Sequence, residues 1–152
     1  MSVTATLANP IATVRDELRL FLRDYFNKNP LHDDVEFVDS ELDAAMTNAV
    51  RHANVIDRPT SWTVDTFPDT YVLMIGASGH LTKSESIRQL RNQAQFQDGN
   101  IQSVGLDEKS SAYLQLSQVL TQEFTQHVRN IKITTNLPIR GFGSPLSRAY
   151  SR

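Results

Sequence analysis

Histidines and clustered acids are the residues of this chain best suited to chemistry. The four histidines are His32, His52, His80 and His127. No two of them have the i, i+4 spacing that places two metal ligands on adjacent turns of a helix. His80 and Glu85 would allow a general acid–base pair on a helix, but a solvated helix face is the simpler interpretation. His52 and His127 are interpreted as ordinary residues at the boundary of a core.

Acidic residues gather around the start of the second predicted helix: Asp33, Asp34, Glu36, Asp39, Glu41 and Asp43. A calcium loop requires oxygen ligands at fixed offsets and a glycine at its sharp turn. The spacing here is irregular and the glycine is absent, so we expect no metal site. Acids near a helix N-terminus stabilise it by about 0.3–1 kcal/mol each, and we interpret the cluster in this way.

Other motifs of catalysis are missing from the sequence. The segment RGFGS, residues 140–144, has two glycines but lacks the Lys-Ser/Thr ending and the preceding strand of a phosphate loop. No serine lies in a G-x-S-x-G motif. The absence of cysteine excludes a thiolate nucleophile, a Cys-ligated zinc and a disulfide framework. We therefore expect a protein that is not an enzyme and that uses no cofactor.

Composition limits the possible partners. The chain has 152 residues, the size of one domain, and its hydrophobic share of 39% lies below the average of about 45–50% for globular proteins. Such a share fits long polar arms or burial completed against a partner. A net charge of −2 argues against a domain that clamps nucleic-acid phosphates. With no apolar run near the roughly 18 residues of a membrane span, and no signal-peptide pattern, we expect a soluble, non-secreted protein.

Four helices are expected from apolar residues at helical spacing. The first follows Asn9-Pro10 and ends at residues 27–30, and the second is capped by Asp39 or Ser40 and broken at residues 57–59. The predicted apolar face of the second helix is Leu42, Ala45, Met46, Ala49, Val50 and Ala53. The third opens at residues 67–69 and continues through Ala94. The fourth is capped by Asp107 and ends near residue 136, and its apolar line is Tyr113, Leu116, Leu120, Phe124, Val128 and Ile131. The intervening SWTVDTF, residues 61–67, would form at most a short extended piece.

The segment TYVLMIGASGH at the start of the third helix is predicted to be the most buried part of the protein or of its assembly, because it is apolar nearly all round. Gly76 and Gly79 each cost about 1 kcal/mol against alanine in a helix, which indicates close helix approach or a local break. Between the third and fourth helices, residues 96–106 predict a protruding β-hairpin or loop turning at Asp98-Gly99-Asn100. The residues of this segment that would contact a neighbouring molecule are Phe96, Asp98, Gly99, Ile101 and Val104.

The predicted fold class is all-α, a bundle of about four helices with one protruding hairpin or loop and extended N- and C-terminal arms. The domains are an N-terminal arm at 1–9, a helical domain at 10–136 and a tail at 137–152. The tail has three arginines, no acid and four spaced apolar residues, Ile139, Phe142, Leu146 and Tyr150. We interpret it as a peptide arm that becomes ordered on an acidic partner, the alternative being an unstructured terminus.

Three stretches together resemble the head–tail connector (adaptor or neck) proteins of tailed bacteriophages. They are VEFVDSELDAAMTNAV in the second helix, the central region YVLMIGASGHLTKSESIRQLRNQAQFQDGNIQSVGLDEKSSAYLQLSQVLTQEF, and the tail RGFGSPLSRAYSR. The most specific part of the resemblance is the order in which the motifs R-N-Q, D-G and D-x-K follow one another along the chain. The resemblance covers roughly residues 35–152. Two departures are the Gly76/Gly79 pair and Asn100, which stands where a second glycine is common.

The resemblance implies a structural virion protein at the head–tail interface, assembled in the cytoplasm of the host bacterium. Its partners would be the portal protein, further copies in a homo-oligomeric ring (a dodecamer to match the portal), and the next neck or tail protein. Genome DNA would pass through without specific binding, with no membrane contact. The portal-binding tail would use Ile139, Arg140, Phe142, Leu146, Arg148 and Tyr150, and the hairpin would contact a neighbouring subunit or the next ring of the neck. Asp33, Asp34 and Glu36 are candidates for channel-facing acids.

The alternative is a small helical regulatory module that binds nucleic acid or protein. A basic recognition helix would support that alternative, and the sequence has none. An enzyme would require a convergent set of polar groups, which the sequence also lacks.

Overall fold

The computed structural model describes residues 10–25, 35–96 and 106–136. Within these ranges the chain has four helices and no strand: α1 (Pro10–Leu22), α2 (Asp39–Val55), α3 (Thr70–Phe96) and α4 (Leu106–Asn136). The predicted all-helical bundle is confirmed. The arms at 1–9 and 137–152 lie outside the described residues. Within the described part, no helix combines the length and the apolar character needed to cross a lipid bilayer.

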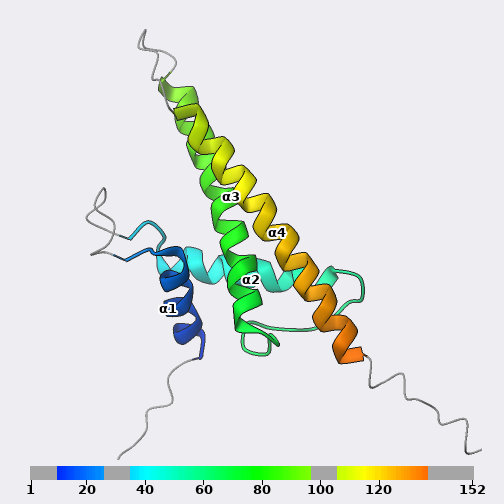
Figure 1. The fold of residues 1–152 in the computed structure, drawn as a ribbon. Helices are drawn as coiled ribbons and strands as arrows, with labels where there is room; N and C mark the ends of the chain where they lie inside the picture. The colour runs from blue at the N-terminus through cyan, green and yellow to red at the C-terminus, as the bar shows by residue number, and fades with distance from the viewer. Residues whose placement is uncertain (1–9, 26–34, 97–105, 137–152) are drawn as a thin grey trace, which may run out of the picture.

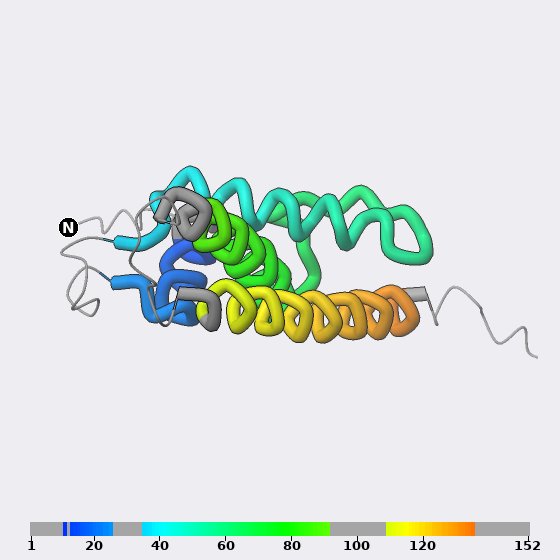
Figure 2. Tube along the Cα trace, turned by 90° about the horizontal axis from the view of Figure 1, so that it is seen from above, coloured from blue at the N-terminus to red at the C-terminus, as the bar shows by residue number. Residues whose placement is uncertain are grey.

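The central element is α3, which packs against the three other helices and most extensively against α4 (Figures 1 and 2). The helices α3 and α4 run antiparallel, and both continue well past α1 and α2 (Figure 1). The bundle therefore has two parts. At one end all four helices share a core, and at the other the α3–α4 pair projects alone.

The core follows the predicted periodicity most closely in α2. Its buried residues are Leu42, Ala45, Met46, Ala49, Val50 and Ala53, which are the six that define the predicted face. In α4, Phe124 and Val128 are buried as predicted, but Leu116 is 48% exposed. Ser117 is buried instead, and its hydroxyl donates to the carbonyl of Gly79 at 3.0 Å. The prediction that Leu116 belongs to the packed face of α4 was wrong. The residue that faces α3 is Ser117, because its small side chain fits close to α3 and its hydroxyl bonds to the α3 backbone.

Close helix approach is the reason for the two glycines of α3. The helix continues through both positions. A Cβ added to Gly76 would lie 2.6 Å from Cε2 of Phe124, and one added to Gly79 would lie 3.3 Å from Oγ1 of Thr121. Of the two predicted explanations, close approach is confirmed and a local break is wrong.

The first helix ends earlier than predicted, at Leu22. Arg23 adopts a left-handed conformation with φ 61°. The amide of Arg23 donates to Leu20 O at 3.2 Å, and that of Asp24 donates to Arg19 O at 3.0 Å. These two bonds form a Schellman motif, which normally favours glycine at the left-handed position. The buried carboxylate of Asp24 accepts from the amides of Glu36 (2.6 Å) and Phe37 (3.0 Å) and fixes this end.

The helix starts also differ in part from the prediction. The cap of α2 is Val38, not Asp39 or Ser40, and its amide donates to the Glu41 carboxylate at 3.0 Å. Asp39 lies in the first turn, where its carboxylate bonds to arginines of α1. The start of α3 is as predicted, since Asp69 Oδ1 accepts from the amides of Tyr71 and Val72. The fourth helix begins at Leu106, so Asp107 belongs to its first turn and is not its cap.

Two segments were predicted to be extended: the hairpin or loop at residues 96–106 and the short piece at residues 61–67. Phe96 and Leu106, placed at the ends of the hairpin, are the last residue of α3 and the first of α4. The run Arg91–Gln95 contains good helix formers, which explains why α3 reaches Phe96. Asp98, Gly99, Ile101 and Val104 lie outside the described residues. Residues 61–67 form no strand but a turn-rich loop held by Asn54, whose side chain bonds to both the amide and the carbonyl of Trp62.

Candidate functional site

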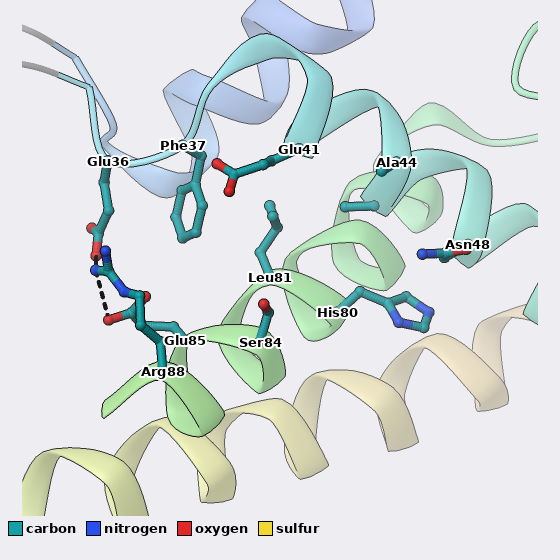
Figure 3. Close-up of a pocket in the computed structure, with 11 residues that line it drawn as sticks. Glu36, Phe37, Glu41, Ala44, Asn48, His80, Leu81, Ser84, Glu85 and Arg88 are labelled. Carbon is teal, nitrogen blue, oxygen red and sulfur yellow. Dashed lines mark hydrogen bonds and ion pairs between the residues drawn. The ribbon is translucent and has the colours of Figure 1, made fainter. Parts of the chain in front are cut away.

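A polar pocket of about 250 Å³ lies between α2, α3 and the segment before α2 (Figure 3). It is lined by Glu36, Phe37, Glu41, Ala44, Ala45, Asn48, His80, Leu81, Ser84, Glu85 and Arg88. Figure 3 shows Glu36, Glu85 and Arg88 at one end and His80 with Asn48 at the other. Phe37 and Leu81 lie between these ends. The lining thus combines a charged end, an apolar middle and a weakly basic end.

The charged end is held together by ion pairs. Arg88 Nε lies 2.7 Å from Glu85 Oε2, and its Nη2 donates to Glu85 Oε1 at 2.9 Å and lies 3.5 Å from Glu36 Oε1. Gln89 Nε2 also donates to Glu85 Oε1, at 2.6 Å. Glu85 is only 3% exposed, so its negative charge requires these partners. The pairing connects the segment before α2 to α3 and is a structural use of these charges.

His80 has different neighbours from those an acid–base pair with Glu85 would require. Its ring centroid lies 6.2 Å from that of His52 on α2, and Glu85 is occupied by Arg88 and Gln89. Burial lowers the pKa of His80, and the nearby His52 and Lys83 lower it further. His52 in turn lies 5.7 Å from the ring of Phe124. Both histidines therefore lie where α2 crosses the α3–α4 pair.

The acids at the start of α2 bind arginines of α1. Arg15 forms a two-pronged contact with Asp43, at 3.0 and 2.8 Å. Asp39 accepts from Arg15 at 2.9 Å and from Arg19 at 2.6 Å, which keeps the pKa of Asp39 below its usual range. Among the described residues no group of three or more His, Asp or Glu is placed to hold a metal ion. Asp33 and Asp34 lie outside the described residues.

Lys132 is a structurally important residue that the sequence analysis missed. It is 4% exposed, and its Nζ donates to the carbonyls of Ala53 (2.6 Å), Ile56 (2.6 Å) and Arg58 (2.7 Å). The ammonium also lies 5.3 Å from the centroid of the Trp62 ring. The ammonium of Lys132, on α4, thus binds the carbonyls around the C-terminal end of α2, where a positive charge is favourable. The only sequence signal was its position four residues after Val128 on the buried face.

Over residues 77–96 and 106–119 the α3–α4 pair carries exposed apolar side chains. Those with 44–60% exposure are Ile87 and Leu90 on α3 and Leu114, Leu116 and Val119 on α4. In the prediction, Ile87 and Leu90 belonged to the continuation of the third helix through Ala94. Both lie on α3 next to Ser84, Glu85 and Arg88, which line the pocket shared with α2, but are themselves exposed. The residues predicted to bind the portal, Ile139 to Tyr150, lie outside the described residues.

Comparison with known proteins adds no relative: no family model, curated protein or solved structure gives a significant match to this chain. Functional inference therefore depends on the residues themselves. The charges of the pocket join the segment before α2 to α3, and Asp39 and Asp43 of α2 bind the arginines of α1. The exposed apolar residues lie on a rigid helical extension, and such a surface is suited to contact with another macromolecule.

Proposed function

We propose that the protein is a structural component of a tailed-phage virion, an adaptor that forms a ring between the portal and the next neck or tail protein. The observation that carries this proposal is the exposed apolar surface of the α3–α4 pair, formed by Ile87, Leu90, Leu114, Leu116 and Val119. Apolar side chains held on a rigid projection favour a protein whose surface is completed by assembly. The resemblance of the central region and tail to head–tail connectors supplies the class of assembly.

In this proposal the tail, residues 137–152, is the portal-binding arm. Its sequence combines three arginines with Ile139, Phe142, Leu146 and Tyr150 and contains no acid. A short segment of this kind gains binding energy from apolar anchors in pockets and orientation from its charges. The helical domain has its own core formed by α1 to α4, so removal of the tail is expected to leave that domain folded.

The test is binding of the portal protein encoded in the same genome. A chain cut after Leu137 should keep the helical content of the four helices in circular dichroism and lose capture by immobilised portal. A double variant, Phe142→Ala with Tyr150→Ala, should also lose capture, whereas the matched polar variant Ser144→Ala with Ser147→Ala should keep it. Retained capture by the truncated chain would refute the assignment of the arm. Electron microscopy of the mixture should reveal a ring on the portal.

The channel-facing acids are a second part of the proposal. A DNA channel should not bind phosphate strongly, and acidic side chains on its wall would meet that requirement. Glu36 also contacts Arg88 at 3.5 Å, so its replacement would disturb a structural pair. Asp33→Lys with Asp34→Lys is therefore the cleaner change, and it should impair retention or ejection of packaged DNA. Unchanged infectivity of phage carrying this double variant would contradict the assignment.

A further inference from the structure

One exposed surface of the projecting pair has its apolar residues bracketed by cations. On α3 the exposed residues Lys83, Ile87, Leu90 and Arg91 follow the i, i+4, i+7, i+8 spacing of a single helix face. Ile87 is 50% exposed and Leu90 is 60% exposed. Ile87 lies seven residues, about two turns, after His80, which contacts His52 of α2. This stripe therefore runs beside Ser84, Glu85 and Arg88, which line the pocket shared with α2, and its own side chains stay exposed.

Leu114 adds to the same surface from α4. It lies eighteen residues, about five full turns, before Lys132, which bonds to carbonyls of α2. Leu114, 44% exposed, thus occupies the α2-facing side of α4. The bonds from Ser110 to Ser86 O and from Ser117 to Gly79 O fix the register, so Leu114 lies near the level of Lys83. We call Lys83, Ile87, Leu90, Arg91 and Leu114 the hairpin patch.

A second exposed apolar surface lies at the opposite end of the molecule. The rings of Phe21 on α1 and Tyr71 at the start of α3 meet edge to face, with centroids 6.4 Å apart. Phe21 is 41% exposed, Tyr71 is 51% exposed and Leu20 is 56% exposed. The exposed Glu17 lies one turn before Phe21 and Leu20, and the exposed Asp69 accepts a bond from the Tyr71 amide at 2.9 Å. We call Glu17, Leu20, Phe21, Asp69 and Tyr71 the base patch.

The two patches are complementary but cannot meet within one chain. Both have an apolar centre, and their charged members are basic in the hairpin patch and acidic in the base patch. Tyr71 and Leu90 lie on one continuous helix, nineteen residues and about 28 Å apart along its axis. Contact between the patches must therefore occur between two molecules.

We propose that the hairpin patch of one copy docks on the base patch of the next. Because the two surfaces differ, each copy keeps one free patch after the first contact, so the contact repeats in one direction and gives a ring or an open filament. The apolar centres would supply affinity, and the opposed charges would set orientation and make association sensitive to salt. This inference rests on the proposed function in that it supplies the subunit contact which an adaptor ring requires.

Sedimentation of the purified full-length chain tests the proposal without portal protein. We expect concentration-dependent self-association at low ionic strength that weakens as salt is added. Glu17→Lys and Arg91→Glu should each weaken association at least about tenfold, whereas the double variant and an equimolar mixture of the two single variants should recover it. Arg51→Glu, at an exposed cation of α2 outside both patches, is the matched control and should associate like the wild type.

Apolar variants give the sharper result. Ile87→Asp retains only an intact base patch, and Tyr71→Asp retains only an intact hairpin patch. Each should be monomeric alone, and their mixture should form a one-to-one dimer and nothing larger. A wild-type chain that stays monomeric, a charge swap that does not recover association, or a mixture without the dimer would overturn the proposal. Portal capture is measured separately, so failure of self-association and failure of the adaptor function are distinguishable.

Discussion

The ring of Phe124 occupies the space into which a side chain at position 76 would project. A Cβ added to Gly76 would lie 2.6 Å from Cε2 and 2.7 Å from Cδ2 of that ring, and 3.0 Å from the Cβ of Ala49. Phe124 is 1% exposed and is among the largest fully buried side chains. The absence of a side chain at Gly76 therefore allows α4 to insert its main aromatic residue between α2 and α3.

Gly76→Ala is expected to destabilise the protein despite the better helix propensity of alanine. Overpacking of this kind costs about 1–3 kcal/mol, and the propensity gain of about 1 kcal/mol offsets part of it. The net loss in the free energy of unfolding, measured by urea titration, should reach up to about 2 kcal/mol.

Gly79→Ala is the matched control for Gly76→Ala. The nearest heavy atoms to an added Cβ at this position are Thr121 Oγ1 at 3.3 Å and Leu120 Cβ at 3.5 Å. The free energy of unfolding of Gly79→Ala should therefore differ from that of the wild type by less than about 0.5 kcal/mol, or rise slightly. The double variant Gly76→Ala with Phe124→Leu should show less than the sum of the two single losses. A higher urea midpoint for Gly76→Ala alone would contradict the packing argument.

The sequence predicted the helices well where the signal is local. The α2 core face was correct because its apolar spacing is independent of any partner. The glycines of α3 indicated a close approach, but the partner of Gly76 is Phe124, which periodicity cannot pair with a distant helix. Two helix ends depend on polar bonds that apolar spacing does not show. At the start of α2 the Val38 amide bonds locally to the Glu41 side chain, and at the end of α1 Asp24 bonds to the more distant amides of Glu36 and Phe37.

Asp24 is expected to be the most sensitive acid of the described residues, because its carboxylate joins three partners. It is 4% exposed, pairs with Arg19 Nη1 at 3.0 Å and accepts the amides of Glu36 and Phe37. Asp24→Asn removes the charge and leaves Arg19 without one of its two carboxylates. Removal of one partner of a buried ion pair costs about 3–5 kcal/mol. Because asparagine keeps part of the hydrogen bonding, we expect the free energy of unfolding, measured by heat or urea, to fall by about 2–4 kcal/mol.

The control for Asp24→Asn is Asp16→Asn, an identical change at an exposed position of α1. Surface substitutions of this kind usually change stability by less than about 0.5 kcal/mol. Equal effects of the two variants would show that the contacts of Asp24 contribute little.

The candidate site was harder to predict than the fold, since it depends on which surfaces remain uncovered. Ile87 and Leu90 are apolar residues of the predicted third helix, and only the three-dimensional arrangement shows that they stay exposed. Glu85 was considered as a partner of His80, but Arg88 and Gln89 at three and four residues distance are the closer helix neighbours. The pocket shared by His80, Glu85 and Glu36 required the crossing of α2 over α3, which no local pattern specifies.

Lys132→Met should destabilise the junction of α2 and α4. The substitution keeps most of the aliphatic volume but removes three bonds to the carbonyls of Ala53, Ile56 and Arg58. Hydrogen bonds to charged groups contribute about 1.5–3 kcal/mol, and the carbonyls left behind would need new partners. We expect a loss of about 2–4 kcal/mol in urea unfolding, together with faster amide exchange in the last turn of α2.

Lys83→Met is the matched control for Lys132→Met, because Lys83 is exposed on α3. Its stability should remain within about 0.5 kcal/mol of the wild type. Unchanged exchange in α2 of Lys132→Met would contradict the role assigned to this lysine.

Protonation of His80 is expected to destabilise the fold as the pH falls. Its pKa lies below the ordinary value of 6.5 because of burial, with further lowering by His52 and Lys83. The same surroundings include Asn48 of α2 and, at the other end of the pocket, the paired Glu85 and Arg88. Below pH 6.5 the unfolded chain therefore binds a proton at this residue more readily than the folded chain does. The contribution of His80 to stability is full above that pH and declines as the pH falls toward its folded-state pKa.

His80→Gln should reduce this pH dependence. When urea unfolding is compared at about pH 7.5 and about pH 5.5, the wild type should lose more stability than the variant does. His127→Gln, at a half-buried site on α4 away from the His52–His80 pair, serves as the control and should behave as the wild type. Carboxylates contribute their own acid dependence to all three proteins, so the difference between them is the quantity to measure. An equal loss in the wild type and His80→Gln would show that the junction of α2 with α3 tolerates a charged imidazole.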